Sequence, residues 1–301
     1  MFGLGLIHEM VEPILVIQGN LWSKMDMEKR LGFRAGRFTA ANPSLSLLAA
    51  ALLTGVFYGL MLVLRAQGKS EALTFFTDPF LRPGNLFTVV PVVFIFFFSM
   101  TMLFIKGRKV ALQRKAFEWA VVPAQPDFVL VEASAQAVLD RVHGIIDQPK
   151  QFILLNRIER ALSNLRHLGQ VSEVSSVLRG QAEDDENAVA ASFTLLQGLV
   201  WAMPVLGFIG TVQGLSSAVG GFSKVLQTAG DLTAVKGALT NVTSGLATAF
   251  ETTLVALVAS LIVQLCITLR QRQELGLLDD CSEYCQSNVI SKLRMDDPRR
   301  G

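Results

Sequence analysis

The stretch AMPVLGFIGTVQGL, residues 202–215, decides the fold. It is apolar enough for a lipid bilayer, yet it contains three glycines, a proline, a glutamine and a threonine. A helix that only had to cross lipid would be better built from leucine, because glycine and proline are poor helix formers. We therefore expect this helix to pack against close neighbours in a membrane and to place polar groups among them.

The composition of the whole chain is typical of a membrane protein. Of its 301 residues, 51% are hydrophobic and 17% are charged, and the mean hydropathy is +0.43. These values are too apolar for an ordinary soluble domain of this size. The net charge of +2 is small and no basic patch is interleaved with aromatic residues, which excludes nucleic-acid binding. The amino terminus has no basic segment before its apolar residues and includes Glu9 and Glu12, which is atypical of a cleaved signal peptide.

Four stretches are long and apolar enough to cross a bilayer, which takes about 20 residues of helix. They cover roughly residues 47–64, 86–105, 194–219 and 247–269. Lys and Arg residues cluster before the first stretch, after the second and after the fourth, so both termini and the long middle segment are expected on the cytoplasmic side. The linkers around 65–85 and 220–246 are then outside.

The sequence thus predicts an all-α membrane protein with four transmembrane helices. A helical cytoplasmic domain is expected between the second and third of them. The predicted parts are a cytoplasmic or interfacial segment (1–46), two transmembrane helices (47–106), the cytoplasmic domain (107–193), two further transmembrane helices (194–269) and a cytoplasmic C-terminal helix (270–301). The first 22 residues can form an interfacial helix that places Trp22 near the lipid headgroups.

Helical periodicity marks the middle segment. In QFILLNRIERALSNLRHL, residues 151–168, the apolar residues fall on one face and Arg157 is expected on the polar side. The acidic run at 183–186 is expected to be a solvated helix end. The apolar face consists of Phe152, Leu155, Ile158, Leu162 and Leu165.

Gly207, Gly210 and Gly214 share one face of the third span, at spacings of three and four residues. Such faces let helix backbones approach closely in lipid, where apolar surface gives no driving force for association. Close packing accounts for these glycines by itself. It leaves Thr211 and Gln213 unexplained.

Threonines of the third and fourth spans are expected at one depth. Thr211 follows Thr194 by the same distance as Thr253 precedes Arg270, so at 1.5 Å per residue both lie roughly 25 Å above the inner boundary. Hydroxyls at one level can form a polar ring if the subunit repeats around an axis. The alternative is that the threonines bond back to carbonyls of their own helix. Both hypotheses apply to Thr211, Thr248, Thr252 and Thr253.

Two motifs carry a resemblance to a known family. PVLGFIGTVQGL, residues 204–215, resembles the motif of the MotA/TolQ/ExbB proton channel family in which a Pro, an LG pair and a GT pair open a pore-lining helix. GLATAFETTLVAL, residues 245–257, resembles the family's other pore-lining helix. The resemblance covers residues 202–269 and the layout of the chain, and four spans are similar to the MotA branch, since TolQ and ExbB have three.

The resemblance implies a homopentameric ring around two copies of a single-span partner of the MotB, TolR or ExbD type. The partner's membrane-embedded Asp takes up and releases a proton or a sodium ion, and threonine hydroxyls of the ring can solvate either form of it. Thr211 and Thr253 match the family's pore threonines, with Thr252 and Thr248 beside them on the ion pathway. Pro204 matches a proline implicated in gating, and Gly207, Gly210 and Gly214 accompany it.

The implied function is that of a motor subunit in a bacterial inner membrane, which converts ion motive force into mechanical work. We expect no enzyme activity, no metal and no cofactor, because no nucleotide-binding, peptidase or esterase motif is present and the histidines are scattered. The alternative function is a non-conducting membrane scaffold or a small transporter subunit, in which the glycines and threonines only pack helices.

Glu251 is an ionisable residue within the fourth span, which makes it a candidate functional residue. It lies about 200° around the helix from Thr253. One hypothesis assigns it to the ion pathway, in ion uptake or relay. The other places it near the outer interface, where it reaches water or pairs with Lys236.

Overall fold

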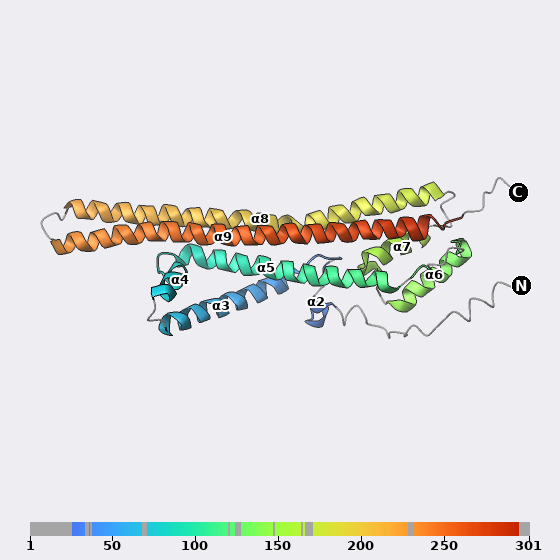
Figure 1. Cartoon of the computed structure of the whole chain (residues 1–301), viewed down its shortest axis with the longest axis horizontal. Helices are drawn as coiled ribbons and strands as arrows, with labels where there is room; N and C mark the ends of the chain where they lie inside the picture. Colours follow the sequence, from blue (N-terminus) through green and yellow to red (C-terminus); the bar gives the residue numbers. More distant parts are fainter. Residues whose placement is uncertain are drawn as a thin grey trace, which may run out of the picture. The chain divides into compact units, whose positions relative to one another are not determined.

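The computed structural model describes residues 26–33, 36, 38–67, 71–119, 121–123, 128–146, 148–163, 165, 171–227 and 232–294. Over these residues the chain is built from helices and forms no strand (Figure 1). An isolated backbone bridge joins Leu130 and Leu293. The interfacial helix predicted over residues 1–22 lies outside the described residues.

Four of the helices are long and apolar enough to cross a membrane. Each contains one of the four predicted spans, so the prediction of an all-α chain with four membrane-capable helices is confirmed. These helices are α3 (Pro43–Gln67), α5 (Leu86–Arg114), α8 (Val171–Gln227) and α9 (Leu232–Cys285).

The helices extend beyond the predicted spans. The expected linker at 220–246 is helical over 220–227 and 232–246, because α8 and α9 both continue through it. Small residues keep the two helices in contact there: a Cβ added to Gly221 would lie 3.4 Å from a methyl carbon of Val242. The expected linker at 65–85 contains the short helix α4 (Glu71–Leu81), which packs against α3.

The chain divides into two compact units. The first consists of residues 1–40, 107–190 and 272–301, and the second of residues 41–106 and 191–271. All four predicted spans belong to the second unit.

The first unit contains short helices together with segments of α5, α8 and α9. These short helices are α2 (Met27–Arg30), η1 (Lys115–Trp119), α6 (Glu132–Ile145), η2 (Pro149–Gln151), α7 (Ile153–Ser163) and the π-helical turn η3 (Gln286–Ile290). The predicted apolar face of α7 is buried at Phe152, Leu155, Ile158 and Leu162.

Two charged residues of this unit lie where the sequence did not place them. Arg157, expected on the polar side of its helix, is 1% exposed, and its Nε donates to Asp185 Oδ2 at 2.8 Å. Asp185 belongs to the acidic run that was expected at a solvated helix end, but the run lies inside α8 and Asp185 is buried. The expectation of solvation was wrong at Asp185, because its carboxylate takes the buried Arg157 as its partner in place of water. The other three residues of the run, Glu183, Asp184 and Glu186, are exposed.

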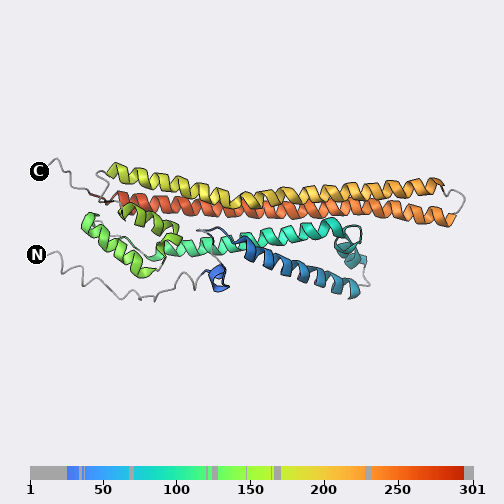
Figure 2. The same cartoon turned by 180° about the vertical axis from the view of Figure 1, so that it is seen from behind.

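In the second unit, α8 and α9 lie side by side and antiparallel, as Figures 1 and 2 show from opposite sides. Their contact holds the stretch 202–215 against residues 245–260. The candidate site is built on this helix pair.

Candidate functional site

The glycine face of α8 is in backbone contact with α9. A Cβ added to Gly214 would lie 2.5 Å from the carbonyl oxygen of Gly245, and one added to Gly207 would lie 2.6 Å from the Cβ of Ala256. A Cβ on Gly210 would overlap the side chain of Thr252. Because none of these positions has room for a side chain, the glycines set how closely the two helices approach.

This close approach brings Thr211 and Thr253 together. Their hydroxyl oxygens are in direct contact, at the common level calculated from the sequence. Each hydroxyl also reaches across to the facing helix, since Thr211 Oγ1 lies 3.1 Å from Ala249 O and Thr253 Oγ1 lies 3.1 Å from Gly207 O. Both side chains are half-buried.

The same two carbonyls serve both hydroxyls. Thr211 Oγ1 lies 3.3 Å from Gly207 O of its own helix, and Thr253 Oγ1 lies 3.1 Å from Ala249 O of its own helix. A hydroxyl has one proton, so each threonine can donate to only one of its acceptors at a time. The own-helix bonds of the packing hypothesis are thus present, and the two hydroxyls also contact each other. We call Thr211 and Thr253 the hydroxyl pair.

Thr252 and Thr248 have different surroundings. Thr252 is 1% exposed and donates to the carbonyl of Thr248 at 2.9 Å, which is the own-helix bond of the packing hypothesis. Thr248 is also buried, and a Cβ added to Gly84 would lie 3.0 Å from its hydroxyl oxygen. Neither side chain is part of the hydroxyl pair.

Pro204 lies inside α8 without ending it. Proline has no N–H, so the carbonyl four residues earlier, at Val200, loses its helical donor. The hydroxyl of Ser260 on α9 donates to that carbonyl at 3.2 Å. Sequence reasoning missed Ser260; its only signal was a hydroxyl within the apolar run ALVASLIVQL.

Glu251 is bound on both carboxylate oxygens. Arg82 Nη2 donates to Oε1 at 2.9 Å, and Asn85 Nδ2 donates to Oε2 at 2.7 Å. The partner of this carboxylate is thus Arg82, not the Lys236 considered from the sequence. The reason is tertiary, because the turn between α4 and α5 reaches α9 at this level. The Arg in LRPGN, residues 81–85, was the available signal.

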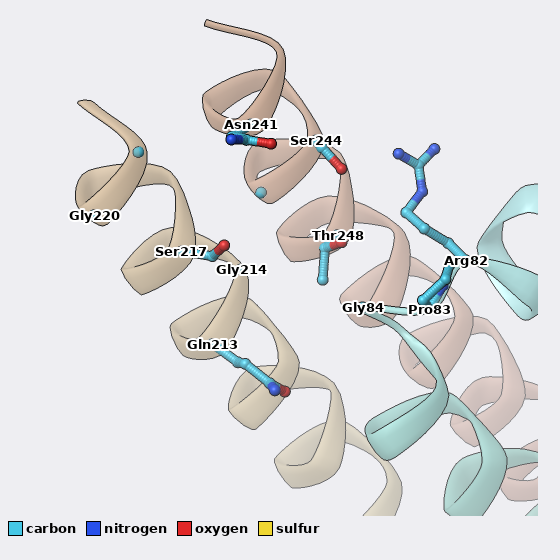
Figure 3. A pocket seen from close by; sticks show the side chains of 12 residues that line it. Arg82, Pro83, Gly84, Gln213, Gly214, Ser217, Gly220, Asn241, Ser244 and Thr248 are labelled. Atoms are coloured by element: carbon cyan, nitrogen blue, oxygen red, sulfur yellow. The ribbon is translucent and has the colours of Figure 1, made fainter. Parts of the chain in front are cut away.

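A pocket of about 550 Å³ lies between α8, α9 and the turn that joins α4 to α5 (Figure 3). Gln213, which packing did not explain, lies on its wall. Apart from Arg82, the lining is uncharged, and its hydroxyl and amide groups can hold water or solvate an ion. The polar lining comes from Gln213 and Ser217 of α8, from Asn241, Ser244 and Thr248 of α9, and from Arg82.

The four membrane-capable helices describe a multi-pass membrane protein, and a polar contact joins the last two of them. Residues 146–276 match the model of the MotA/TolQ/ExbB proton channel family, so the resemblance seen in the sequence is confirmed over this region. The matched region includes the hydroxyl pair and the glycine face. Comparison with curated proteins and with solved structures gives no significant match.

Proposed function

We propose that this chain is the ring-forming subunit of an ion-driven motor in a bacterial inner membrane, with both termini in the cytoplasm. Five copies surround two copies of a single-span partner of the MotB, TolR or ExbD type. Protons or sodium ions pass between the ring and the partner's acidic residue, and the ion motive force is converted into mechanical work. The chain itself has no enzymatic step, metal or cofactor.

The observation that carries this proposal is the hydroxyl pair within the matched region. Thr211 and Thr253 place two hydroxyls at one level, and the donor pattern between them can rearrange without movement of the helices. Such groups can donate to an ionised carboxylate and can accept from a protonated one. Hydroxyl groups therefore suit a channel wall that faces the partner's acidic residue, whose carboxyl group alternates between the protonated and the ionised form.

The alternative is a non-conducting scaffold or a small transporter subunit. The glycine face supports it, because backbone contact between α8 and α9 is required for packing in either case. The polar pocket favours the channel, since a helix pair that only packs has no need of a pocket lined by Gln213 and Ser217 within a membrane-capable helix.

The test is ion flux into cells or vesicles that contain this chain and its partner, recorded as internal pH after an external acid pulse. Thr211→Val and Thr253→Val keep the side-chain shape and remove the hydroxyl. Hydrogen bonds to charged groups contribute about 1.5–3 kcal/mol, so each change should lower partner-dependent flux about tenfold or more. Thr211→Ser should restore it.

Thr268→Val is the matched control, because Thr268 is exposed and its hydroxyl donates to the carbonyl of Gln264 of its own helix at 3.0 Å. It should leave flux unchanged. If flux survives in both Thr211→Val and Thr253→Val, the chain is still a channel, but the assignment of the hydroxyl pair to the ion path is rejected. Absence of flux under proton and sodium gradients, with every single-span acidic partner tried, would favour the scaffold.

A further inference from the structure

The turn between α4 and α5, residues 82–85, binds the carboxylate of Glu251 through Arg82 and Asn85. We call this turn the corner. Asn85 is fully buried, and its Nδ2 donates to the carbonyl of Pro79 at 2.9 Å as well as to Glu251. The carbonyl of Asn85 accepts from the N–H of Val89 at 2.8 Å, at the start of α5. Arg82 also lies 3.7 Å from Asp78. The corner is thus tied to both of its own helices.

The corner meets α9 at a second point. Gly84 faces Thr248, where a Cβ would lie 3.0 Å from the threonine hydroxyl oxygen. Thr248 and Glu251 are three residues apart and therefore share one side of α9. Figure 3 shows Gly84 beside Thr248, with Arg82 at the same corner. Two contacts on one side of a helix restrain both its rotation and its height.

The hydroxyl pair lies on a different side of α9. Thr253 is two residues after Glu251, which turns its side chain by about 200°. Helix α9 is therefore held between the corner, which it meets through Glu251, and α8, which it meets through Thr253. A helix is stiff over so few residues, so rotation that releases Glu251 also turns Thr253 away from Thr211.

We propose that Arg82 and Asn85 are positioning residues that act through Glu251 to hold Thr253 against Thr211. In this role Glu251 keeps both oxygens bound and carries no ion, and Arg82 neutralises its charge within the helix bundle. Any consequence for ion flow rests on the proposed function. The inference that the corner holds Thr253 against Thr211 is independent of that function.

The geometry is tested without any partner. Thr211→Cys and Thr253→Cys are combined in a chain whose Cys266 is replaced by Ala, and the membranes are oxidised with copper phenanthroline. The disulfide within one chain is quantified by mass spectrometry of its peptides. The pair should cross-link efficiently when the corner is native. Arg82→Ala with Glu251→Ala removes both members of the ion pair between the corner and α9, and Asp78 keeps its contact with Arg65. This double variant should lower cross-linking several-fold.

Two further variants distinguish loss of the Arg82–Glu251 ion pair from a general loss of structure. Arg82→Lys keeps a cation near Glu251 and should retain most of the cross-linking. Arg65→Ala is the matched control, since Arg65 approaches Asp78 at 4.0 Å and has a half-exposed side chain. It should have no effect. Native cross-linking in the double-alanine chain, or its loss in Arg65→Ala, would overturn the proposal.

Ion flux in the charge-swapped chain, Arg82→Glu with Glu251→Arg, distinguishes positioning from relay. The swapped pair can still join the corner to α9, because the amide of Asn85 can turn its oxygen to the arginine. Recovery of both cross-linking and flux, relative to the double-alanine chain, supports positioning. Recovered cross-linking without flux would make Glu251 a relay and overturn the proposal. If native chains show no flux but the cross-linking pattern holds, the proposed function fails and the geometric inference stands.

Discussion

At the scale of single residues, Arg157 and Asp185 show how burial depends on a partner. Arg157 donates to Asp185 and also to Ser282 Oγ at 2.8 Å, so one guanidinium joins α7, α8 and α9 within the first unit. A helical pattern assigns charged residues to the outer face. It cannot reveal that two charges far apart in the chain will meet.

Asp185→Leu should destabilise this unit strongly. Removal of one member of a buried pair leaves the other charge without compensation, at a cost of about 3–5 kcal/mol. Arg157→Met together with Asp185→Leu should recover most of that loss. Thermal unfolding of the purified chain in detergent measures both.

The exposed pair of Arg114 and Asp280 provides the comparison. Its atoms are 3.3 Å apart, but the side chains are 52% and 47% exposed. Arg114→Ala should therefore cost no more than about 1 kcal/mol. Equal losses from the buried and the exposed pair would contradict this account of Arg157.

At the scale of elements, α8 continues through Pro204 because α9 satisfies the carbonyl that the proline leaves free. Ser260 donates to Val200 O, and both residues are buried. The bend or hinge that a proline allows is thereby tied to the neighbouring helix. This bond couples the proline of the family motif to a residue outside that motif.

A double-mutant cycle tests the coupling. Ser260→Ala alone should cost about 1–3 kcal/mol, because it leaves a buried carbonyl without a donor. In a Pro204→Ala chain the same change should cost much less, since the alanine N–H returns to Val200. Apparent stability in detergent gives the four corners of the cycle. Additive effects would show that Ser260 does not serve the freed carbonyl.

At the scale of the whole molecule, α8 and α9 present large apolar side chains that are not covered within one chain. Phe208 is 66% exposed and Leu254 is 62% exposed. Both lie in the matched region. Lipid or neighbouring subunits must cover such surface in a membrane.

We expect the purified complex with its single-span partner to contain five copies of this chain and two of the partner. Native mass spectrometry of the complex, released from detergent, measures this stoichiometry directly. Gly210→Val should reduce assembly, because its added side chain overlaps Thr252 and pushes α8 away from α9. Gly55→Val is the control, since Gly55 of α3 has open space around its Cβ position. A stable complex with another copy number would contradict the proposed ring.

The sequence by itself determined the helical class, the four membrane-capable helices, the likeness of residues 146–276 to the MotA/TolQ/ExbB family model and the common depth of Thr211 and Thr253. The length of an apolar segment, the spacing of its glycines and the rise per helical residue are local quantities, so they can be read directly from the sequence. Only the tertiary structure decided that Glu251 binds Arg82, that Ser260 serves the carbonyl freed by Pro204, and that Arg157 is buried against Asp185. Each of these contacts joins residues far apart in the chain, and local periodicity contains no information about such pairs.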